Sequence, residues 1–517
     1  MVYRKKISEM KNQLHFLLFL FVCTLWSGFF FVMPYFHDNP VNNFAAFAEL
    51  AGYWSITCLA SFLVLTIAAS SKYVFAVFFP IFVFFGAVLG FFRYFYAATL
   101  TPMLIDASLH NDLRTSADLI SWQLCAFIAL NMTFAVVMIY LRWKKIAVRK
   151  AWIYGIFAIV FLVVLYNANG RLRRSLQERY PINVYHSLRL YSEYRTMIAA
   201  ERINPCKSVV RTSTDSLTVV LVLGESLRAD HLSLNGYGRK TTPLLAKREN
   251  LVSFPNIYSP YTHTNPSLPY ILTRADSLSP ERAYTETSFI PLFNKCGFYS
   301  AWIANQDPAE TYIGLMYECD TVLFVHPEKT VFVLKTWLDE DLLPFVKAVQ
   351  NISNPNKLLI LHTIGSHWYY NNHVSQECTQ FLPITETRIL SQCNKEEIVN
   401  SYDNTIVYTD YFLNKLFDSF ENENAIVIYL ADHSESLGED GYWLHANDAP
   451  AEKNPACIIW FSGKYKEKHP DYFENMEKNK NNRFGTEFLY HSILHSANIQ
   501  TDVYKDSLDV FSINELR

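Results

Sequence analysis

The chain has 517 residues, half of which are hydrophobic, and a formal net charge of −3. Its mean hydropathy is only +0.06, so the apolar residues must be concentrated in one part of the chain. The near-neutral charge, with no basic cluster outside three short loops of the N-terminal part, argues against a nucleic-acid partner.

The first 168 residues contain five nearly continuous apolar stretches. Each is close to the ~20 residues that a helix needs to cross a bilayer, and Trp, Tyr and Phe crowd the ends of the stretches. We therefore predict an N-terminal bundle of five transmembrane helices within residues 1–168, at positions 14–33, 53–69, 74–98, 120–141 and 152–168.

Lysine and arginine residues set the predicted orientation of these helices. They gather at the N-terminus, in the loop after the second stretch and in the loop after the fourth, "RWKKIAVRK". The positive-inside rule places these three segments in the cytoplasm. Because the number of helices is odd, the rest of the chain is expected on the outer side of the membrane, as in a multi-pass membrane protein.

Six cysteines follow the last apolar stretch. Outside the cytoplasm such cysteines form disulfides more often than metal sites, and six of them allow several pairings between which the sequence does not choose. Joining nearest neighbours predicts the pairs Cys296–Cys319 and Cys378–Cys393.

Residues 169–216 are polar and rich in arginine, with apolar residues at helical spacing. This pattern predicts a linker with one or two amphipathic helices along the membrane surface, although a plain tether fits the pattern equally well.

From residue 217 onward, short apolar runs alternate with longer mixed segments. Residues 396–418 have the pattern of a helix, and five runs have that of a strand buried on both faces: "LTVVLVLGES", "FYSAWIAN", "KLLILHTIGSH", "AIVIYLADHS" and "ACIIWFSG". Such alternation predicts an α/β fold with a central, mostly parallel sheet that is covered by helices on both faces. We assign this domain to residues 217–517.

Three of the predicted strands end in side chains that bind metals or phosphate. Glu225 ends the first strand, His367 ends "LLILHTIGSH", and Asp432 and His433 end "IVIYLADHS". Ligands of open α/β sheets bind at the carboxyl ends of the strands, so these side chains are expected to meet there. Two carboxylates and an imidazole suit Zn²⁺, with Mn²⁺ as the alternative.

Thr264, in "SPYTHTNPSLPY", is the candidate for a fourth ligand. The Asn265-Pro266 pair that follows it suits the first turn of a helix. A hydroxyl at a helix N-terminus and on a metal has a lowered pKa, which makes it a useful nucleophile. Taken alone, Thr264 would be an N-cap and His367 or His445 a surface histidine, but their combination at strand and helix ends favours a site.

Five segments together resemble the membrane-bound phosphoethanolamine transferases of the alkaline phosphatase superfamily. The segments are "VLGESLRADHLSLNGYGRKTTPLL", "THTNPSLP", "IGSHWYY", "NSYDNTIVYTD" and "YLADHSESLGEDGYWLH". The resemblance extends over nearly the whole chain, and as a set these motifs are highly specific. It implies a periplasmic hydrolase-like domain attached to the inner (plasma) membrane of a bacterium.

The resemblance also implies roles for individual residues. Catalytic and substrate-side histidines would be His367 and His445, and the Cys378–Cys393 disulfide gains support. The implied zinc ligands, with the threonine as nucleophile, are Glu225, Thr264, Asp432 and His433.

The loop "TPMLIDASLHNDLRTSADLIS" resembles the donor-lipid loop of this family, with Asn111 and Thr115 as substrate-binding residues. The chain departs from the family pattern at four positions. Leu119 stands where the family has an acidic residue, Ser434 replaces the glycine of "DHGES", and Trp368 follows "GSH". Tyr270 stands where many members have a cysteine, so a disulfide is not expected there. The first departure weakens the assignment of the donor loop, and the third alters the expected acceptor pocket.

The implied reaction is a two-step displacement. Thr264 would attack phosphatidylethanolamine, release diacylglycerol and pass phosphoethanolamine to a lipopolysaccharide-type acceptor, lipid A or a core sugar, or to another cell-surface glycan or lipid. Three other functions are alternatives to this one. A sulfatase is disfavoured, because the Cys/Ser and the Arg of the formylglycine motif are both absent around Thr264. A phosphoglycerol transferase of the lipoteichoic-acid-synthase type and a non-catalytic lipid-binding module are the other two.

Overall fold

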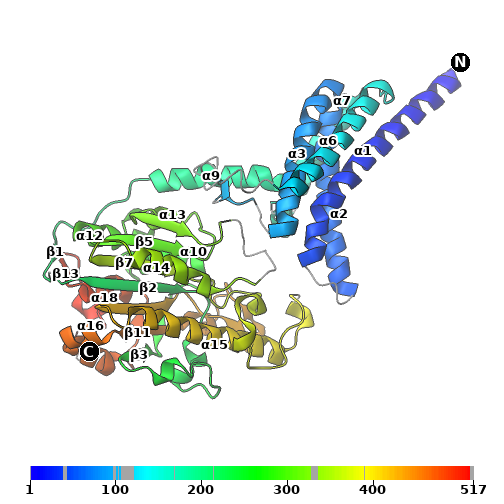
Figure 1. Cartoon of the computed structure of the whole chain (residues 1–517). Helices are drawn as coiled ribbons and strands as arrows, with labels where there is room; N and C mark the ends of the chain where they lie inside the picture. The colour runs from blue at the N-terminus through cyan, green and yellow to red at the C-terminus, as the bar shows by residue number, and fades with distance from the viewer. Residues whose placement is uncertain are drawn as a thin grey trace. The chain divides into compact units, whose positions relative to one another are not determined.

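Figure 1 shows the computed structural model of the chain. The structure describes residues 2–38, 44–96, 100–102, 104–105, 121–148, 150–167, 169–177, 179–213, 215–327, 336–388 and 390–512. The chain forms two compact units, one built mainly of Met1–Ser192 and one built of Glu193–His326 and Thr336–Arg517.

The N-terminal unit is helical. Its long helices are α1 (Val2–Asp38), α2 (Phe44–Ala69), α3 (Lys72–Tyr96), α6 (Trp122–Lys144) and α7 (Ala151–Asn167). Within the described residues, three segments are long and apolar enough to cross a membrane: Leu50–Ala69, Lys72–Tyr94 and Trp122–Lys144. Helices therefore cover the five predicted spans, but five crossings are not confirmed, because α7 is shorter and α1 does not meet this criterion within the described residues.

Polar side chains join the helices of this unit. Arg142 of α6 is buried and donates to the carbonyl oxygen of Ala69 at the end of α2, at 2.8 Å. This contact satisfies one of the carbonyl groups that a helix C-terminus leaves without a partner. The indole of Trp26 in α1 donates to Asn131 of α6 at 3.0 Å. The following segment contains two further helices, α8 (Gly170–Gln177) and α9 (Ile182–Ala199).

A seven-stranded sheet forms the centre of the second unit. Its order is β3 (Leu251–Phe254), β11 (Cys457–Phe461), β8 (Ala425–Ala431), β2 (Leu217–Gly224), β7 (Asn356–His362), β5 (Tyr299–Ala304) and β6 (Thr321–Phe324). The strands from β8 to β6 are parallel, whereas β11 runs antiparallel to both of its neighbours. The prediction of a mostly parallel sheet is confirmed, with "ACIIWFSG" as the reversed strand.

Helices cover both faces of this sheet (Figure 1). Val220 and Val222 of β2 pack in one core cluster with residues of α14 (Leu343–Gln350) and α15 (Lys395–Phe420). The alternate residues of β2 are equally buried, and successive side chains of a strand point to opposite faces. The other face lies toward α12 (Ile290–Lys295), which packs on β5.

The remaining elements are short. The helices are α10 (Thr264–Leu272), α11 (Arg282–Thr285), α13 (Ile313–Met316), α16 (Gly463–Lys468), α17 (Pro470–Asn479) and α18 (Phe488–Ser496). Three two-stranded pairs complete the unit: β1 (Val209–Arg211) with β13 (Ile499–Thr501), β4 (Ile257–Tyr258) with β12 (Phe484–Gly485), and β9 (Ser436–Leu437) with β10 (Trp443–Leu444).

Two of the sequence segments that carry the family resemblance form one structural unit around α15. Asp403 of α15 is fully buried and accepts hydrogen bonds from the side chains of Tyr237 and Arg239, at 3.0 and 2.9 Å, and it contacts His231 at 2.7 Å. Two helical turns further on, Asp410 accepts hydrogen bonds from the backbone N–H groups of residues 244 and 245. The helix therefore fixes the irregular loop 231–245 through two buried carboxylates.

The two predicted disulfides are not formed in the structure. The Cys378 thiol packs in a small cluster with Val374, Val407 and Tyr408, whereas the Cys393 thiol donates to the carbonyl oxygen of Thr387 at 3.2 Å. Each sulfur lies in surroundings of its own, so closeness in the sequence was a poor guide to pairing.

Replacing Asp403 with alanine is expected to lower the free energy of unfolding by about 3 kcal/mol, because three donors lose a buried, charged acceptor. Thermal or chemical unfolding of the full-length protein in detergent measures this change. Asp418→Ala is the control: Asp418 forms an ion pair with Arg248 but is 60% exposed, and its loss should cost less than about 1 kcal/mol. Equal effects of the two substitutions would contradict the proposed role of α15.

Candidate active site

The ends of β2 and β8 bring together the side chains that the sequence placed there. Glu225 follows β2 directly, Asp432 and His433 follow β8, and all three are at least 99% buried. The N–H of Asp432 donates to the carbonyl oxygen of Gly224 at 3.1 Å. Only glycine fits at position 224, because a Cβ atom there would lie 2.3 Å from the hydroxyl of Tyr429 on the neighbouring strand.

The imidazole of His433 faces two carboxylates. Its Nδ1 lies 2.9 Å from the carbonyl oxygen of Ser434, a contact in which the ring nitrogen must donate. Nε2 then faces Glu225 Oε1 at 3.5 Å and Asp432 Oδ2 at 3.4 Å. Within the described part of the chain, neither His433 Nε2 nor Asp432 Oδ2 has a hydrogen-bond partner.

These partnerless, buried atoms fit a bound cation. Burying polar atoms without partners is unfavourable, and carboxylate oxygens with a neutral imidazole nitrogen are typical zinc ligands. Glu225, His433 and His445 also have ligand atoms that lie within 4.8 Å of one another. The described residues therefore form a candidate metal site at Glu225, Asp432 and His433, with His445 close beside it.

Thr264 is the first residue of α10, and its hydroxyl donates to Glu225 Oε2 at 3.1 Å. Unlike the neighbouring carboxylates, the threonine is only partly buried, so a substrate can approach it. A helix N-terminus also favours negative charge. The arrangement suits a hydroxyl that attacks an electrophile while losing its proton.

The pKa shifts of the two carboxylates also favour a bound cation. Burial opposes ionisation of Glu225, but the surrounding His433, His367 and His445 lower its pKa. Burial and the nearby charge of Glu225 raise the pKa of Asp432. Two carboxylates held this close repel each other, and a divalent cation between them removes that repulsion.

Two histidines lie beside the cluster. The rings of His445 and His433 have centroids 4.7 Å apart, and those of His445 and His367 are 6.0 Å apart. His445 Nδ1 lies 2.9 Å from Glu435 Oε2. Burial opposes protonation of His445, but Glu435, with Glu225 and Asp432, raises its pKa to about 9. Protonated in this way, His445 presents a second N–H toward the cluster.

A tight backbone contact positions the His367 loop. Gly365 has a φ of +50°, and a Cβ atom there would lie 2.9 Å from the carbonyl oxygen of Glu225. The buried Asp339 carboxylate accepts the N–H groups of Ile364 and Gly365 at 2.8 and 3.0 Å. The end of β7 is thereby fixed against the residue that follows β2.

Comparison with known proteins identifies the family of this chain. The family model described as Sulfatase matches residues 218–499, more than half of the chain. The chain belongs to the sulfatase family.

The names of individual relatives of this sulfatase-family chain describe a more specific activity than the family model does. It is 34% identical to the phosphoethanolamine transferase EptA of Helicobacter pylori over 314 residues, 56% of each chain. It resembles the solved soluble domain of lipooligosaccharide phosphoethanolamine transferase A from Neisseria meningitidis, with a TM-score of 0.53 and 29% identity, over 59% of this chain and 95% of that one. The resemblance seen in the sequence is confirmed, although the chain spans about half the length of the curated relatives it matches.

The integral membrane form of the Neisseria meningitidis enzyme matches over 95% of this chain and 98% of that one, with a TM-score of 0.54. At 24% identity this likeness shows the fold alone. It indicates that the sulfatase-family chain shares the fold of an integral membrane protein along nearly its whole length.

Sequence analysis missed three polar residues around the sulfatase-family site. Gln306, just after β5, donates to Glu225 Oε2 at 3.0 Å and to the carbonyl oxygen of Thr363 at 2.6 Å. Its place after the run "FYSAWIAN" was a signal that could have found it. Glu435 binds His445 and accepts from the Tyr370 hydroxyl at 2.7 Å. The third residue is the fully buried Glu452.

Glu452 lies seven residues after His445, but no local pattern marks it as part of the site. Its carboxylate accepts hydrogen bonds from the Ser436 hydroxyl at 2.6 Å and from the backbone N–H of Asn447 at 2.9 Å. It thereby fixes both ends of the loop that carries His445. The two predicted donor-loop residues, Asn111 and Thr115, lie outside the described residues.

The metal content of the purified full-length protein tests the ligand set. The wild type should retain zinc by elemental analysis, and Asp432→Asn should weaken zinc binding by at least about tenfold, because it removes a charged ligand. Asp471→Asn, an exposed position on α17, is the control and should bind zinc like the wild type. Unchanged zinc content in Asp432→Asn would remove this residue from the site.

Gly365→Ala is expected to destabilise the protein by about 2–4 kcal/mol, through the left-handed φ and the clash with Glu225. It should also weaken zinc retention, because relief of the clash displaces Glu225. Unfolding curves and elemental analysis measure both effects. Gly463→Ala, where a Cβ atom meets nothing within 4 Å, should change neither. Wild-type zinc retention in a folded Gly365→Ala protein would contradict the positioning argument.

Proposed function

We propose that the protein transfers phosphoethanolamine from phosphatidylethanolamine to a lipopolysaccharide-type acceptor, lipid A or a core sugar, through a phosphorylated Thr264. The observation that carries this proposal is the convergence of the Thr264 hydroxyl with Glu225 and with the partnerless atoms of Asp432 and His433. The names of the relatives, EptA and lipooligosaccharide phosphoethanolamine transferase A, support the choice of substrates.

In the first step the Thr264 oxygen attacks the phosphorus of phosphatidylethanolamine. The bond from phosphorus to the glycerol oxygen breaks, and diacylglycerol leaves with a proton. Glu225, which accepts the hydrogen bond of the hydroxyl, is placed to receive the proton of Thr264. His445, held by Glu435 and close to His367, is placed to donate an N–H to the leaving oxygen.

In the second step an acceptor hydroxyl or phosphate oxygen attacks the phosphorus on Thr264, and the threonine hydroxyl is restored. A zinc ion, or Mn²⁺ in its place, bound by Glu225, Asp432 and His433 would supply a Lewis acid that lowers the pKa of the hydroxyl and stabilises charge on the phosphoryl oxygens. The N-terminus of α10 adds a fixed positive partial charge at the same point.

The membrane part of the proposal follows from the substrates. Both the donor and the acceptor are lipids, which suits a multi-pass protein of the bacterial inner membrane with its catalytic domain, residues 217–517, in the periplasm. Residues 1–168 and the linker 169–216 would attach this domain to the bilayer, and Asn111 and Thr115 would contact the donor lipid.

Sulfate-ester hydrolysis is not proposed, although the chain belongs to the sulfatase family. The nucleophile position is Thr264 and the fifth residue of the motif is Leu268, so the residues that form formylglycine are absent from this segment. Phosphoglycerol transfer of the lipoteichoic-acid-synthase type is the second candidate, and it predicts a different covalent adduct.

The proposal is tested by the intact mass of the full-length protein after incubation with phosphatidylethanolamine. The wild type should gain the mass of one phosphoethanolamine group, and Thr264→Ala should not, because the attacking oxygen is gone. Thr264→Ser keeps a hydroxyl at the same place and should still form the adduct. Incubation with phosphatidylglycerol is the discriminating arm: an adduct there, and none with phosphatidylethanolamine, would identify a phosphoglycerol transferase instead.

A further inference from the structure

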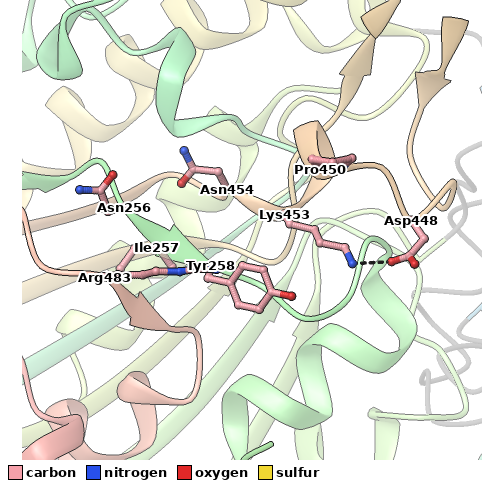
Figure 2. Close-up of a pocket in the computed structure, with 8 residues that line it drawn as sticks. All are labelled: Asn256, Ile257, Tyr258, Asp448, Pro450, Lys453, Asn454 and Arg483. Carbon is pink, nitrogen blue, oxygen red and sulfur yellow. Dashed lines mark ion pairs between the residues drawn. The ribbon is translucent and has the colours of Figure 1, made fainter. Parts of the chain in front are cut away.

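A hollow of about 390 Å³ lies beside the candidate active site. Its lining residues come from two chain segments, 256–258 and 448–454, and from Arg483 (Figure 2). Its volume is within the range of small-molecule sites, ~300–1,000 Å³. Five of its eight lining residues carry charged or amide side chains, Asn256, Asp448, Lys453, Asn454 and Arg483, and these could bind the polar groups of a ligand.

The same two segments build the candidate active site. Tyr258 lies six residues before Thr264 and Asp448 three residues after His445. Between them, Ser259 donates its N–H to the carbonyl oxygen of Lys453 at 2.9 Å and its hydroxyl to that of Asp432 at 3.2 Å. One residue therefore separates the wall of the hollow from the metal-ligand cluster.

Two cationic side chains reach the hollow. The Arg483 guanidinium lies 4.7 Å from the centroid of the Tyr258 ring, a contact that holds its plane in place. Within the described part of the chain it makes no hydrogen bond or ion pair, so its five N–H groups are available to a ligand. Lys453 Nζ is held by Asp448 at 2.6 Å and keeps two further donors (Figure 2).

An amide oxygen complements these donors. Asn454 Oδ1 is buried and has no hydrogen-bond partner among the described residues. A buried acceptor of this kind is satisfied by a hydroxyl or an N–H of a ligand. The hollow thus combines donors for an anion such as phosphate, which arginine can bind through two parallel N–H groups, with an acceptor for a sugar hydroxyl.

We propose that this hollow binds the phosphorylated sugar of the acceptor while Thr264 carries the transferred group. Arg483 and Lys453 bind the phosphate, and Asn454 accepts a sugar hydroxyl. The identity of the ligand as an acceptor rests on the proposed function. The hollow then acts in the second step alone, because the donor lipid reacts before the acceptor is needed.

Separate measurement of the two half-reactions tests this assignment on the full-length protein. Arg483→Gln should form the phosphoethanolamine adduct at the wild-type rate. Its adduct should discharge to lipid A at least about tenfold more slowly at limiting acceptor, the effect of losing one charge-assisted contact. Lys478→Gln, which removes one positive charge on exposed α17, is the matched control and should match the wild type in both steps.

Unchanged discharge in Arg483→Gln would overturn the proposal. Slower formation of the adduct in this variant, with normal discharge, would overturn it in favour of donor binding at the hollow. Arg483→Gln should unfold at the same temperature as the wild type, because the side chain is exposed.

A binding experiment tests the hollow independently of the proposed reaction. The full-length Thr264→Ala protein is titrated with glucosamine 1-phosphate and with glucosamine by isothermal calorimetry, which needs no turnover. The phosphorylated sugar should bind at least about tenfold more tightly, and adding Arg483→Gln should abolish that preference. Equal binding of the two sugars, or a preference that survives Arg483→Gln, would refute the hollow as a phosphate site even if the wild type forms its adduct. If no adduct forms, the proposed function fails while this arm still decides the hollow.

Discussion

The candidate active site depends on one constraint, the burial of two carboxylates side by side at the ends of adjacent strands. Ionised groups are expensive to bury unless donors or opposite charges face them. The chain supplies part of this compensation: the N–H groups of Ser226 and His433 donate to Asp432, and Gln306 donates to Glu225. What is left, Asp432 Oδ2 facing His433 Nε2, has the chemistry of a cation site.

Buried carboxylates also organise the irregular parts of the domain. Asp339, Asp403, Glu435 and Glu452 each accept hydrogen bonds from a loop or a side chain near the site. Loops have no ladder of backbone hydrogen bonds to fix them, and charged acceptors form stronger hydrogen bonds than neutral ones. This explains why the motifs of the sequence are rich in acids, most of which do not face the proposed substrate.

The sequence predicted the parts of the site that a local pattern marks. Runs buried on both faces identified the parallel strands, so Glu225, Asp432 and His433 at their ends were found, and the proline after Thr264 marked the start of α10. Glu452 was missed because its role depends on contacts with residues 436 and 447 that only the folded chain creates. The two predicted disulfides are not formed in the structure, and sequence spacing contains no information on where the thiols point. The reversed direction of β11 is likewise a tertiary property.

Only two stretches of chain build most of the site and the hollow beside it. Residues 256–264 run from the wall of the hollow to the nucleophile, and residues 432–454 run from the metal ligands through His445 back to that wall. Thr262 and Ala446 join the two stretches by a backbone hydrogen bond of 2.9 Å. Because the stretches are bound to each other, the wall of the hollow has a fixed position relative to Thr264 and His445. The proposed acceptor pocket and the reacting centre are therefore parts of one rigid arrangement of loops. The acceptor can be positioned against the phosphorylated threonine without the movement of another segment.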